Sequence, residues 1–308
     1  IIGNSNFVFA PRAKALEVNY SVVMGPSSEA LGNAFNQSTP ANNSVILGTD
    51  LRNFNNYSVN IGSSALNTGG LRQDVSGAYS IALGHQNRVG SSYSAAIGEK
   101  NTVNFGTNFS FAIGENNIIN GGSTYCSMIG HSNIIGGMTG SPATSIVLQN
   151  SHTFGNSNTI LGQRSIAIGD SNTINILPAG QANGYALGVD NTVDNKGVAI
   201  GQGNRIESTA DNGLALGYAG RVFGDKSFTI GDSCTTHSTA TAGGAFNNST
   251  DVSGKYGNAF GDQTEAPWYN SFVLGRFNAT STYTTGLQSS SYAGTLPAFL
   301  IGGGLSTL

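Results

Sequence analysis

A five-residue block in which small and large apolar residues alternate recurs along this sequence. Four clear copies are residues 80–84 (Ser-Ile-Ala-Leu-Gly), 94–98 (Ser-Ala-Ala-Ile-Gly), 110–114 (Ser-Phe-Ala-Ile-Gly) and 165–169 (Ser-Ile-Ala-Ile-Gly). Two polar residues, and often an asparagine, follow the glycine. Because successive side chains of a β-strand point to opposite faces, this alternation predicts one strand in each copy.

The copies continue over most of the chain. Clear copies also occupy residues 197–201, 213–217 and 227–231, and degenerate ones 44–48, 58–62, 126–130, 145–149, 257–261, 271–275 and 298–302. The repeat glycines at 84, 98, 114 and 130 are 14, 16 and 16 residues apart. A short period with variable insertions is typical of a solenoid. We expect irregular or degenerate lead-in coils over residues 1–43, a repeat β-roll over 44–261, and terminal coils with an aromatic insertion over 262–308.

Both faces of the predicted strands are non-polar. In the first clear copy Ser80 and Ala82 point one way, while Ile81 and Leu83 point the other. A thin coil buries one face inside itself, so the second face needs a partner. Another copy of the chain, arranged by closed rotational symmetry, is the simplest partner. The sequence therefore predicts a parallel β-solenoid packed around a common axis.

An asparagine recurs three residues after the repeat glycine. These asparagines are Asn87, Asn101, Asn117, Asn133, Asn172, Asn191, Asn204 and Asn278. Asparagine tolerates left-handed turn geometry, and stacked asparagine side chains can form a hydrogen-bonded ladder. We predict such a structural ladder in the turns; the alternative is a polar binding ladder.

This block with its turn asparagine resembles the head repeats of trimeric autotransporter adhesins, the YadA-like head, over residues 44–278. The resemblance implies an all-β, left-handed parallel β-roll with irregular loop insertions, assembled as a homotrimer that binds host surfaces or matrix. Residues 296–304 look like the closing repeat that precedes a stalk or a self-cleaving chaperone domain in trimeric phage and bacterial fibres. The long insertions leave both a bacterial adhesin and a viral tail fibre open.

Composition agrees with a solenoid and excludes several other classes. The 308 residues include 44 glycines, 38% are apolar, 9% are charged, and the net charge is −3. Helical and α/β enzymes need more helix formers, disordered chains need a higher net charge, and nucleic-acid binding needs a basic patch. No apolar run is long enough for direct membrane insertion. Because the chain begins at Ile1 without methionine, we expect a fragment of a longer fibre.

Four residues directly after a repeat glycine form the candidate metal site. Stacking of His85, Glu99, Glu115 and His131 would give a ladder over four coils that could hold a cation. The alternative is that this position simply faces solvent. We predict no metal and no other cofactor, and keep the four residues as weak candidate ligands.

The two cysteines and several carboxylates are further candidates for chemistry. Cys126 and Cys234 lie several coils apart, beyond the roughly 7 Å reach of a disulfide, so we predict free, packed thiols. Four scattered carboxylates could meet in space and supply the acid pair of a polysaccharide depolymerase. They are Asp190, Asp194, Asp211 and Asp225.

Three interruptions of the repeat are the expected binding regions, because loops on a rigid scaffold carry function. They are residues 135–144, 175–184 and 265–270. The candidate binding residues are Met138, Thr139, Leu177, Gln181, Trp268 and Tyr269. The last two could stack on a sugar or anchor a protein contact. Alternatively they seal the coils as a hydrophobic plug.

These observations together predict non-enzymatic adhesion or receptor binding by a trimeric surface fibre. The expected partner is a cell-surface glycan or protein, and nucleic acid is not expected. The expected location is extracellular, on a cell surface or a virion tail. A phage tail fibre or tailspike with depolymerase activity is the alternative. An ice-binding solenoid is less favoured, because regularly spaced Thr-x-Thr rows are missing from the repeats.

Overall fold

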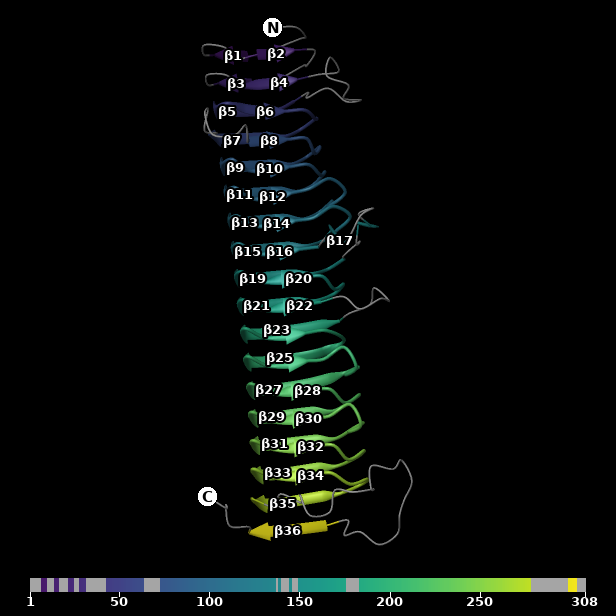
Figure 1. Ribbon diagram of the computed structural model, residues 1–308. Coiled ribbons are helices and arrows are strands. Elements are labelled where there is room, and N and C mark those ends of the chain that lie inside the picture. Colours follow the sequence, from purple (N-terminus) through teal and green to yellow (C-terminus); the bar gives the residue numbers. More distant parts are fainter. Residues whose placement is uncertain are drawn as a thin grey trace. The chain divides into compact units, whose positions relative to one another are not determined.

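The protein is an all-β parallel solenoid (Figure 1). The computed structural model describes residues 7–9, 14–16, 22–24, 28–31, 43–63, 73–136, 138–139, 144–145, 149–175, 183–277 and 299–303. The chain divides into two compact units, Ile1–Arg164 and Ser165–Leu308. Over the residues described there is no helix of the length and hydrophobicity needed to cross a bilayer.

In the first unit each coil contributes one strand to each of two parallel sheets. The first sheet contains β1 (Phe7–Phe9), β3 (Val22–Met24), β5 (Val45–Thr49), β7 (Val59–Ser63), β9 (Ile81–His85), β11 (Ala95–Glu99), β13 (Phe111–Glu115), β15 (Ser127–His131) and β19 (His152–Asn156). The second sheet contains β2 (Lys14–Leu16), β4 (Glu29–Leu31), β6 (Leu51–Asn53), β8 (Gln73–Val75), β10 (Arg88–Val89), β12 (Thr102–Val103), β14 (Ile118–Ile119), β16 (Ile134–Ile135) and β20 (Thr159–Ile160).

The second unit has the same two-sheet coil. Its first sheet contains β21 (Ile166–Asp170), β23 (Gly184–Val189), β25 (Gly197–Gln202), β27 (Gly213–Tyr218), β29 (Phe228–Asp232), β31 (Gly244–Asn248), β33 (Asn258–Asp262), β35 (Phe272–Arg276) and β36 (Phe299–Gly303). Its second sheet contains β22 (Thr173–Ile174), β24 (Thr192–Val193), β26 (Arg205–Ile206), β28 (Arg221–Val222), β30 (Thr235–Thr236), β32 (Asp251–Val252) and β34 (Glu265–Ala266).

Equivalent positions of the repeat stack directly, which confirms the predicted strands and the solenoid. Ala96 pairs with Ala82 and with Ala112 on the neighbouring strands. The prediction of a degenerate repeat strand at 145–149 is wrong. Residues 144–145 belong instead to the antiparallel hairpin of β17 (Met138–Thr139) and β18 (Thr144–Ser145). The strand of that coil is β19, which places Gly155 on Gly130.

In most of the first-sheet strands whose burial is described, only one face is buried within the chain. Ala82, from the first sheet, and Val89, from the second, both point into the coil and are 0% and 1% exposed. The interior is narrow, so alanine of the first sheet faces a branched side chain of the second. Full burial of such a branched side chain contributes about 1.5–3 kcal/mol. The large outward residues stay partly exposed, as Ile81 does at 39%.

The repeat glycine is required by close backbone stacking. Gly98 has a φ of +115°, and a Cβ added there would lie 2.0 Å from the carbonyl oxygen of Gly114. No other residue fits this position without moving the next coil.

The predicted asparagine ladder is confirmed, with one correction to its backbone. Asn101 is fully buried and donates its side-chain amide to Asn87 Oδ1 at 3.1 Å. The left-handed residue is not the asparagine but the one before it, as Lys100 with a φ of 54° illustrates. That turn aims the asparagine side chain inward, where solvent cannot compete for its hydrogen bonds. Sequence inspection missed Asn158, which continues the ladder to Asn133 Oδ1 at 3.0 Å, and Asn278 lies outside the described residues.

The predicted aromatic insertion at 265–270 is also wrong. Strand β34 and a tight turn occupy these residues, and the repeat glycines Gly261 and Gly275 pair on adjacent strands. Trp268 therefore occupies the corner of an ordinary coil. The spacing of 14 residues between the two glycines matches the shortest coils of the best repeat stretch, so no extra loop is present.

Candidate functional site

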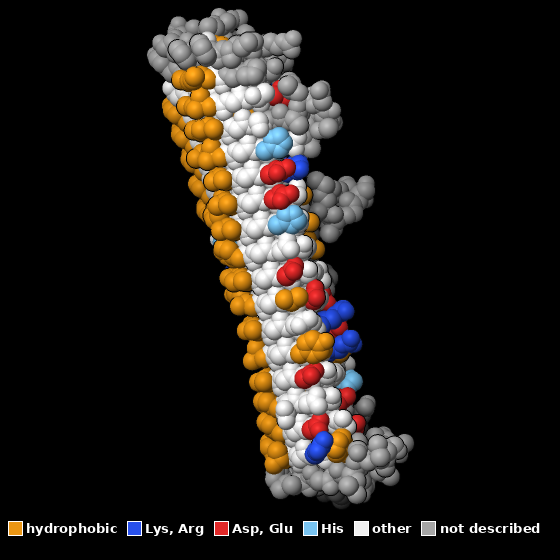
Figure 2. All heavy atoms as spheres, turned by 90° about the vertical axis from the view of Figure 1, so that its left-hand side faces the viewer, with side chains coloured by type: hydrophobic (Ala, Val, Ile, Leu, Met, Phe, Trp, Pro, Cys, Tyr) orange, Lys and Arg blue, Asp and Glu red, His pale blue; other side chains and the backbone are white. Residues whose placement is uncertain are grey.

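A band of partly exposed apolar side chains runs along the outer face of the first sheet in each unit (Figure 2). In the first unit it includes Ile61, Ile81, Phe111, Ile129 and Phe154, and in the second Ile168, Tyr185, Ile200, Phe272 and Leu274. Their exposed fractions lie between 37% and 43%. The band follows from strand alternation, since every second residue of the repeat block points outward. A continuous apolar surface of this kind typically marks an interaction site.

The candidate metal ladder is correctly placed in the strand register, and its side chains are at least partly exposed. Glu99 pairs with His85 and with Glu115, which in turn pairs with His131. Lys100 Nζ lies 2.7 Å from Glu99 Oε1, and His131 Nε2 lies 4.0 Å from Glu115 Oε2.

The contact with Lys100 also changes the acidity of a carboxyl group in this column. The hydrogen bond and charge of Lys100 lower the pKa of Glu99 below its usual value. Within the described ranges no three His, Cys, Asp or Glu side chains are grouped closely enough to hold a metal ion. Acidic and histidine side chains of this column stand beside the apolar band in Figure 2.

The four candidate carboxylates occupy turns and corners of neighbouring coils in the second unit. Asp194 directly follows strand β24 and accepts a hydrogen bond from Arg205 Nη2 at 3.2 Å. Asp190 lies in the left-handed turn before that strand. Asp211 and Asp225 occupy equivalent corners of adjacent coils. Their oxygens lie 3.7 Å from Lys196 Nζ and 4.0 Å from Lys226 Nζ, respectively.

The candidate binding residues of the interruptions fall into three groups. Met138 and Thr139 form strand β17 of the antiparallel hairpin. Leu177 and Gln181 lie outside the described residues.

The third group is the aromatic pair. Trp268 is only 6% exposed, and the Ser271 hydroxyl donates to its carbonyl oxygen at 2.8 Å. Tyr269 is 36% exposed and packs edge-on against Tyr256 with ring centroids 5.6 Å apart. The buried Trp268 ring thus fills the corner of its coil, while Tyr269 remains at the surface.

Both cysteines are free and buried, as predicted. Cys126 occupies the inward serine position of its coil, and burial raises the pKa of its thiol to about 11. Cys234 occupies the ladder position, where it donates to the Asn247 carbonyl at 3.1 Å and accepts from Thr250 Oγ1 at 3.0 Å. These are packing roles rather than reactive ones.

A ladder of stacked aromatic rings was missed by sequence inspection. It consists of Tyr57, Tyr79, Tyr93, Phe109 and Tyr125, each directly before the inward residue of its coil. The ring centroids are 4.8–5.2 Å apart and the rings are nearly parallel. All five residues have a φ near 55°, and their exposed fractions are 49–54%. The recurring aromatic–serine pairs at 79–80, 93–94 and 109–110 were the available signal.

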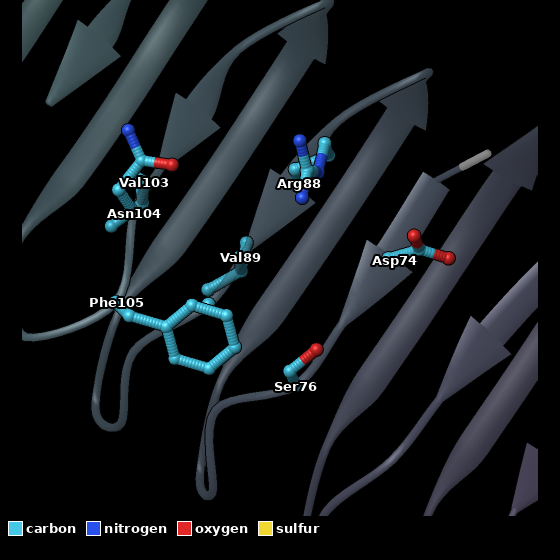
Figure 3. A pocket seen from close by; sticks show the side chains of 8 residues that line it. Asp74, Ser76, Arg88, Val89, Val103, Asn104 and Phe105 are labelled. Atoms are coloured by element: carbon cyan, nitrogen blue, oxygen red, sulfur yellow. The ribbon is translucent and has the colours of Figure 1, made fainter. Parts of the chain in front are cut away.

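A shallow hollow lies on the outer side of the second sheet of the first unit (Figure 3). It is lined by Asp74, Ser76, Arg88, Val89, Gly90, Val103, Asn104 and Phe105. Asp74 and Arg88 are paired on adjacent strands β8 and β10. Phe105 comes from the corner after β12 and is 66% exposed. Sequence inspection missed this hollow, because its residues lie in neither a repeat block nor a predicted insertion.

No protein-family model matches this sequence, and no curated protein is similar to it.

Proposed function

We propose that three copies of this chain, each wound as a left-handed β-roll, form an extracellular fibre that attaches to a glycan or protein on a cell surface without catalysing a reaction. The observation that carries this proposal is the apolar band of the first sheet. Its members recur on successive coils at about 40% exposure, so the apolar area grows with every coil. An isolated solenoid would leave all of this area in water.

Closed rotational symmetry covers the band on every copy. In a cyclic assembly the bands turn toward a common axis, and no copy is left with an open apolar face. The choice of three copies rests on the resemblance of the repeat block to YadA-like heads.

Attachment follows from the geometry of such a fibre. Each weak site on the outer surface would be presented three times, which raises the effective concentration at a target surface. The low charge, with 9% charged residues, suits a glycan or protein surface better than a polyanion.

The assembly is tested by sedimentation of the full chain. The wild-type protein should sediment as a trimer of the 31.6 kDa chain. Replacing Ile168 and Ile200 together by glutamate should dissociate it, because buried unpaired carboxylates are strongly unfavourable. The matched control replaces Thr173 and Thr192 together by glutamate, which introduces the same two charges on the outer sides of β22 and β24 and should leave the trimer intact. A stable wild-type monomer would overturn the trimeric proposal.

The attachment itself is tested with labelled protein on whole cells. Binding to a glycan should be lost after periodate treatment of the cells, and binding to a protein after protease treatment. If a panel of bacterial and animal cells binds none of the trimeric protein, the proposal of an attachment function is wrong.

A further inference from the structure

The hollow on the second sheet combines an exposed aromatic wall with a small floor. It is shallow and open, with about 290 Å³ of free space that includes open solvent. Val89 and Val103 line it through their backbones, since their side chains point inward and are 1% and 0% exposed. A Cβ added at Gly90 would lie 3.3 Å from Phe105 Cδ2, so the ring stands directly against this glycine. The base of the hollow at Gly90 therefore carries no side chain, and the face of the Phe105 ring forms one side.

The corner that carries the ring is held firmly. Ser91 Oγ and Thr107 Oγ1 both donate to the Asn104 carbonyl oxygen, at 2.7 and 2.6 Å. The Asn104 side-chain amide also donates to Asn120 Oδ1 at 3.3 Å. These bonds fix the backbone from which the Phe105 ring projects, and a preorganised site loses less entropy when a ligand binds.

The opposite wall supplies polar groups. In the strand register, Asp74 on β8 lies opposite Arg88 on β10 on one side and opposite Arg52 on β6 on the other. A carboxylate accepts hydrogen bonds at up to about four sites and a guanidinium donates up to about five, so these two side chains can offer a ligand both acceptors and donors. Figure 3 shows Ser76 between this wall and the Phe105 ring.

Acceptors and donors beside an aromatic face match one ligand class in particular. A pyranose has an apolar face of C–H groups that packs on an aromatic ring, and hydroxyls at its edge that both donate and accept. The hollow is shallow and open, which suits one sugar unit lying across it rather than a folded partner.

We propose that the hollow between Phe105 and the Asp74–Arg88 pair binds one pyranose unit of a glycan. The C–H face of the sugar packs on Phe105, and neighbouring hydroxyls bond to Asp74 and Arg88. This inference rests on the proposed attachment function and names its ligand class.

The position of the hollow keeps it accessible in the assembly. Ala82 and Val89 both point into the coil, so the outer sides of the two sheets face away from each other. When the band that includes Ile81 is covered, the side that carries Arg88 remains outermost. A trimer would present this site three times.

Binding is tested by saturation-transfer NMR on the full chain with methyl glucoside, methyl galactoside, methyl mannoside, N-acetylglucosamine and methyl glucuronide as probes. At least one probe should bind with a millimolar dissociation constant. Phe105→Ser should weaken that binding at least tenfold and Asp74→Asn at least fivefold, with an unchanged circular dichroism spectrum.

Matched controls remove an aromatic ring and a carboxylate that lie outside the hollow. Tyr218→Ser removes a ring that is 53% exposed, and Asp170→Asn removes an exposed carboxylate. Both should bind the sugar as the wild type does. The inference is overturned if no probe receives saturation, or if Phe105→Ser binds as well as the wild type. Binding of the glucuronide alone, unchanged by Phe105→Ser, would instead mean simple charge attraction to Arg88 and would also overturn it.

Whole-cell attachment separates failure of this site from failure of the proposed function. If Phe105→Ser attaches to cells as strongly as the wild type, the sugar site is wrong and the attachment function stands. If the wild type itself attaches to no cells, the attachment function fails.

Discussion

Asn117 links two neighbouring coils through a single side chain: its amide donates to Asn101 Oδ1 at 2.9 Å and to the Gly130 carbonyl oxygen at 2.8 Å. Its own Oδ1 accepts from the backbone and side-chain amides of Asn133. The side-chain amide and the side-chain oxygen of Asn117 thus both form hydrogen bonds to neighbouring coils. Since a solenoid is stabilised by nearest-neighbour interfaces, such a residue fixes the register of the coil on both sides.

Removal of one ladder amide should weaken the first unit strongly. Asn117→Ala leaves the partly buried Gly130 carbonyl and the buried Asn133 amide without their hydrogen bonds to Asn117, and each such loss costs about 1–3 kcal/mol. We expect a loss of at least about 3 kcal/mol. Hydrogen exchange should show lost protection in β13 and β15, and the melting temperature should fall. Asn116→Gly, at the adjacent turn residue with a φ of 55°, should cost under about 1 kcal/mol; equal effects of the two changes would contradict this role.

A side chain at the repeat glycine Gly114 should be far more costly than one at another left-handed glycine. Gly114→Ala places a Cβ 2.0 Å from the Gly130 carbonyl oxygen at a φ of +119°. Overpacking and backbone strain together should cost more than about 3 kcal/mol. Gly203→Ala, at a φ of +66° with its nearest neighbouring atoms 4.0 Å away, should cost only about 1–2 kcal/mol. Denaturant unfolding of both variants measures the difference, and a Gly114→Ala protein as stable as Gly203→Ala would show that the close stacking is unimportant.

Much of the fold could be predicted because the repeat encodes it locally. Alternation in residues 80–84 gives the strand, Gly84 gives the close approach, and Asn87 gives the ladder. The strand of one coil was assigned to the wrong residues, because the repeat is degenerate there. Residues 145–149 resemble the repeat block, whereas the strand at 152–156 lacks its alanine and isoleucine. Similarly, β31 has Asn247 where other coils have the glycine, and a search for glycine passes over it.

The surfaces were harder to predict, since they depend on stacking between coils. Asp74 and Arg88 are 14 residues apart in the sequence and become neighbours only through the pairing of β8 with β10. Phe105 reaches the hollow because its coil, from Gly98 to Gly114, is two residues longer than the one before it. Trp268 attracted interest as the only tryptophan of the chain, but its small exposed fraction shows that rarity is no guide to exposure.

The stacked aromatic ladder should stabilise the first unit in proportion to the number of ring contacts. Tyr93→Asn removes two stacked contacts, to Tyr79 at 5.0 Å and to Phe109 at 4.9 Å, and asparagine keeps the left-handed turn. We expect a loss of about 1–3 kcal/mol, because each aromatic pair contributes about 0.5–1.5 kcal/mol.

Tyr57→Asn is the matched control for this ladder. Among the described rings Tyr57 stacks on Tyr79 alone, so this change should cost about half as much. Thermal melts and near-ultraviolet circular dichroism of both variants give the comparison. Equal losses would mean that ring stacking adds nothing beyond the burial of each ring.

Burial of Cys126 should make stability depend on pH in the alkaline range. The pKa of its thiol is about 11 in the folded protein, above the ordinary value of 9.0. Because the folded state favours the neutral thiol, its contribution is complete below pH 9 and is lost as the pH rises through about 11. The full effect of two pKa units is about 2–3 kcal/mol.

Cys126→Ser isolates this effect, because serine occupies the same inward position at Ser94, where its hydroxyl donates to the Thr107 carbonyl oxygen at 3.2 Å. Other alkaline titrations, such as that of Lys100, are common to both proteins and cancel in the difference. Denaturant unfolding should therefore show a wild-type stability that falls relative to Cys126→Ser between pH 9 and 10.5. A difference that stays constant from pH 7 to 10.5 would mean that the thiolate of Cys126 is as well accommodated in the folded coil as in the unfolded chain.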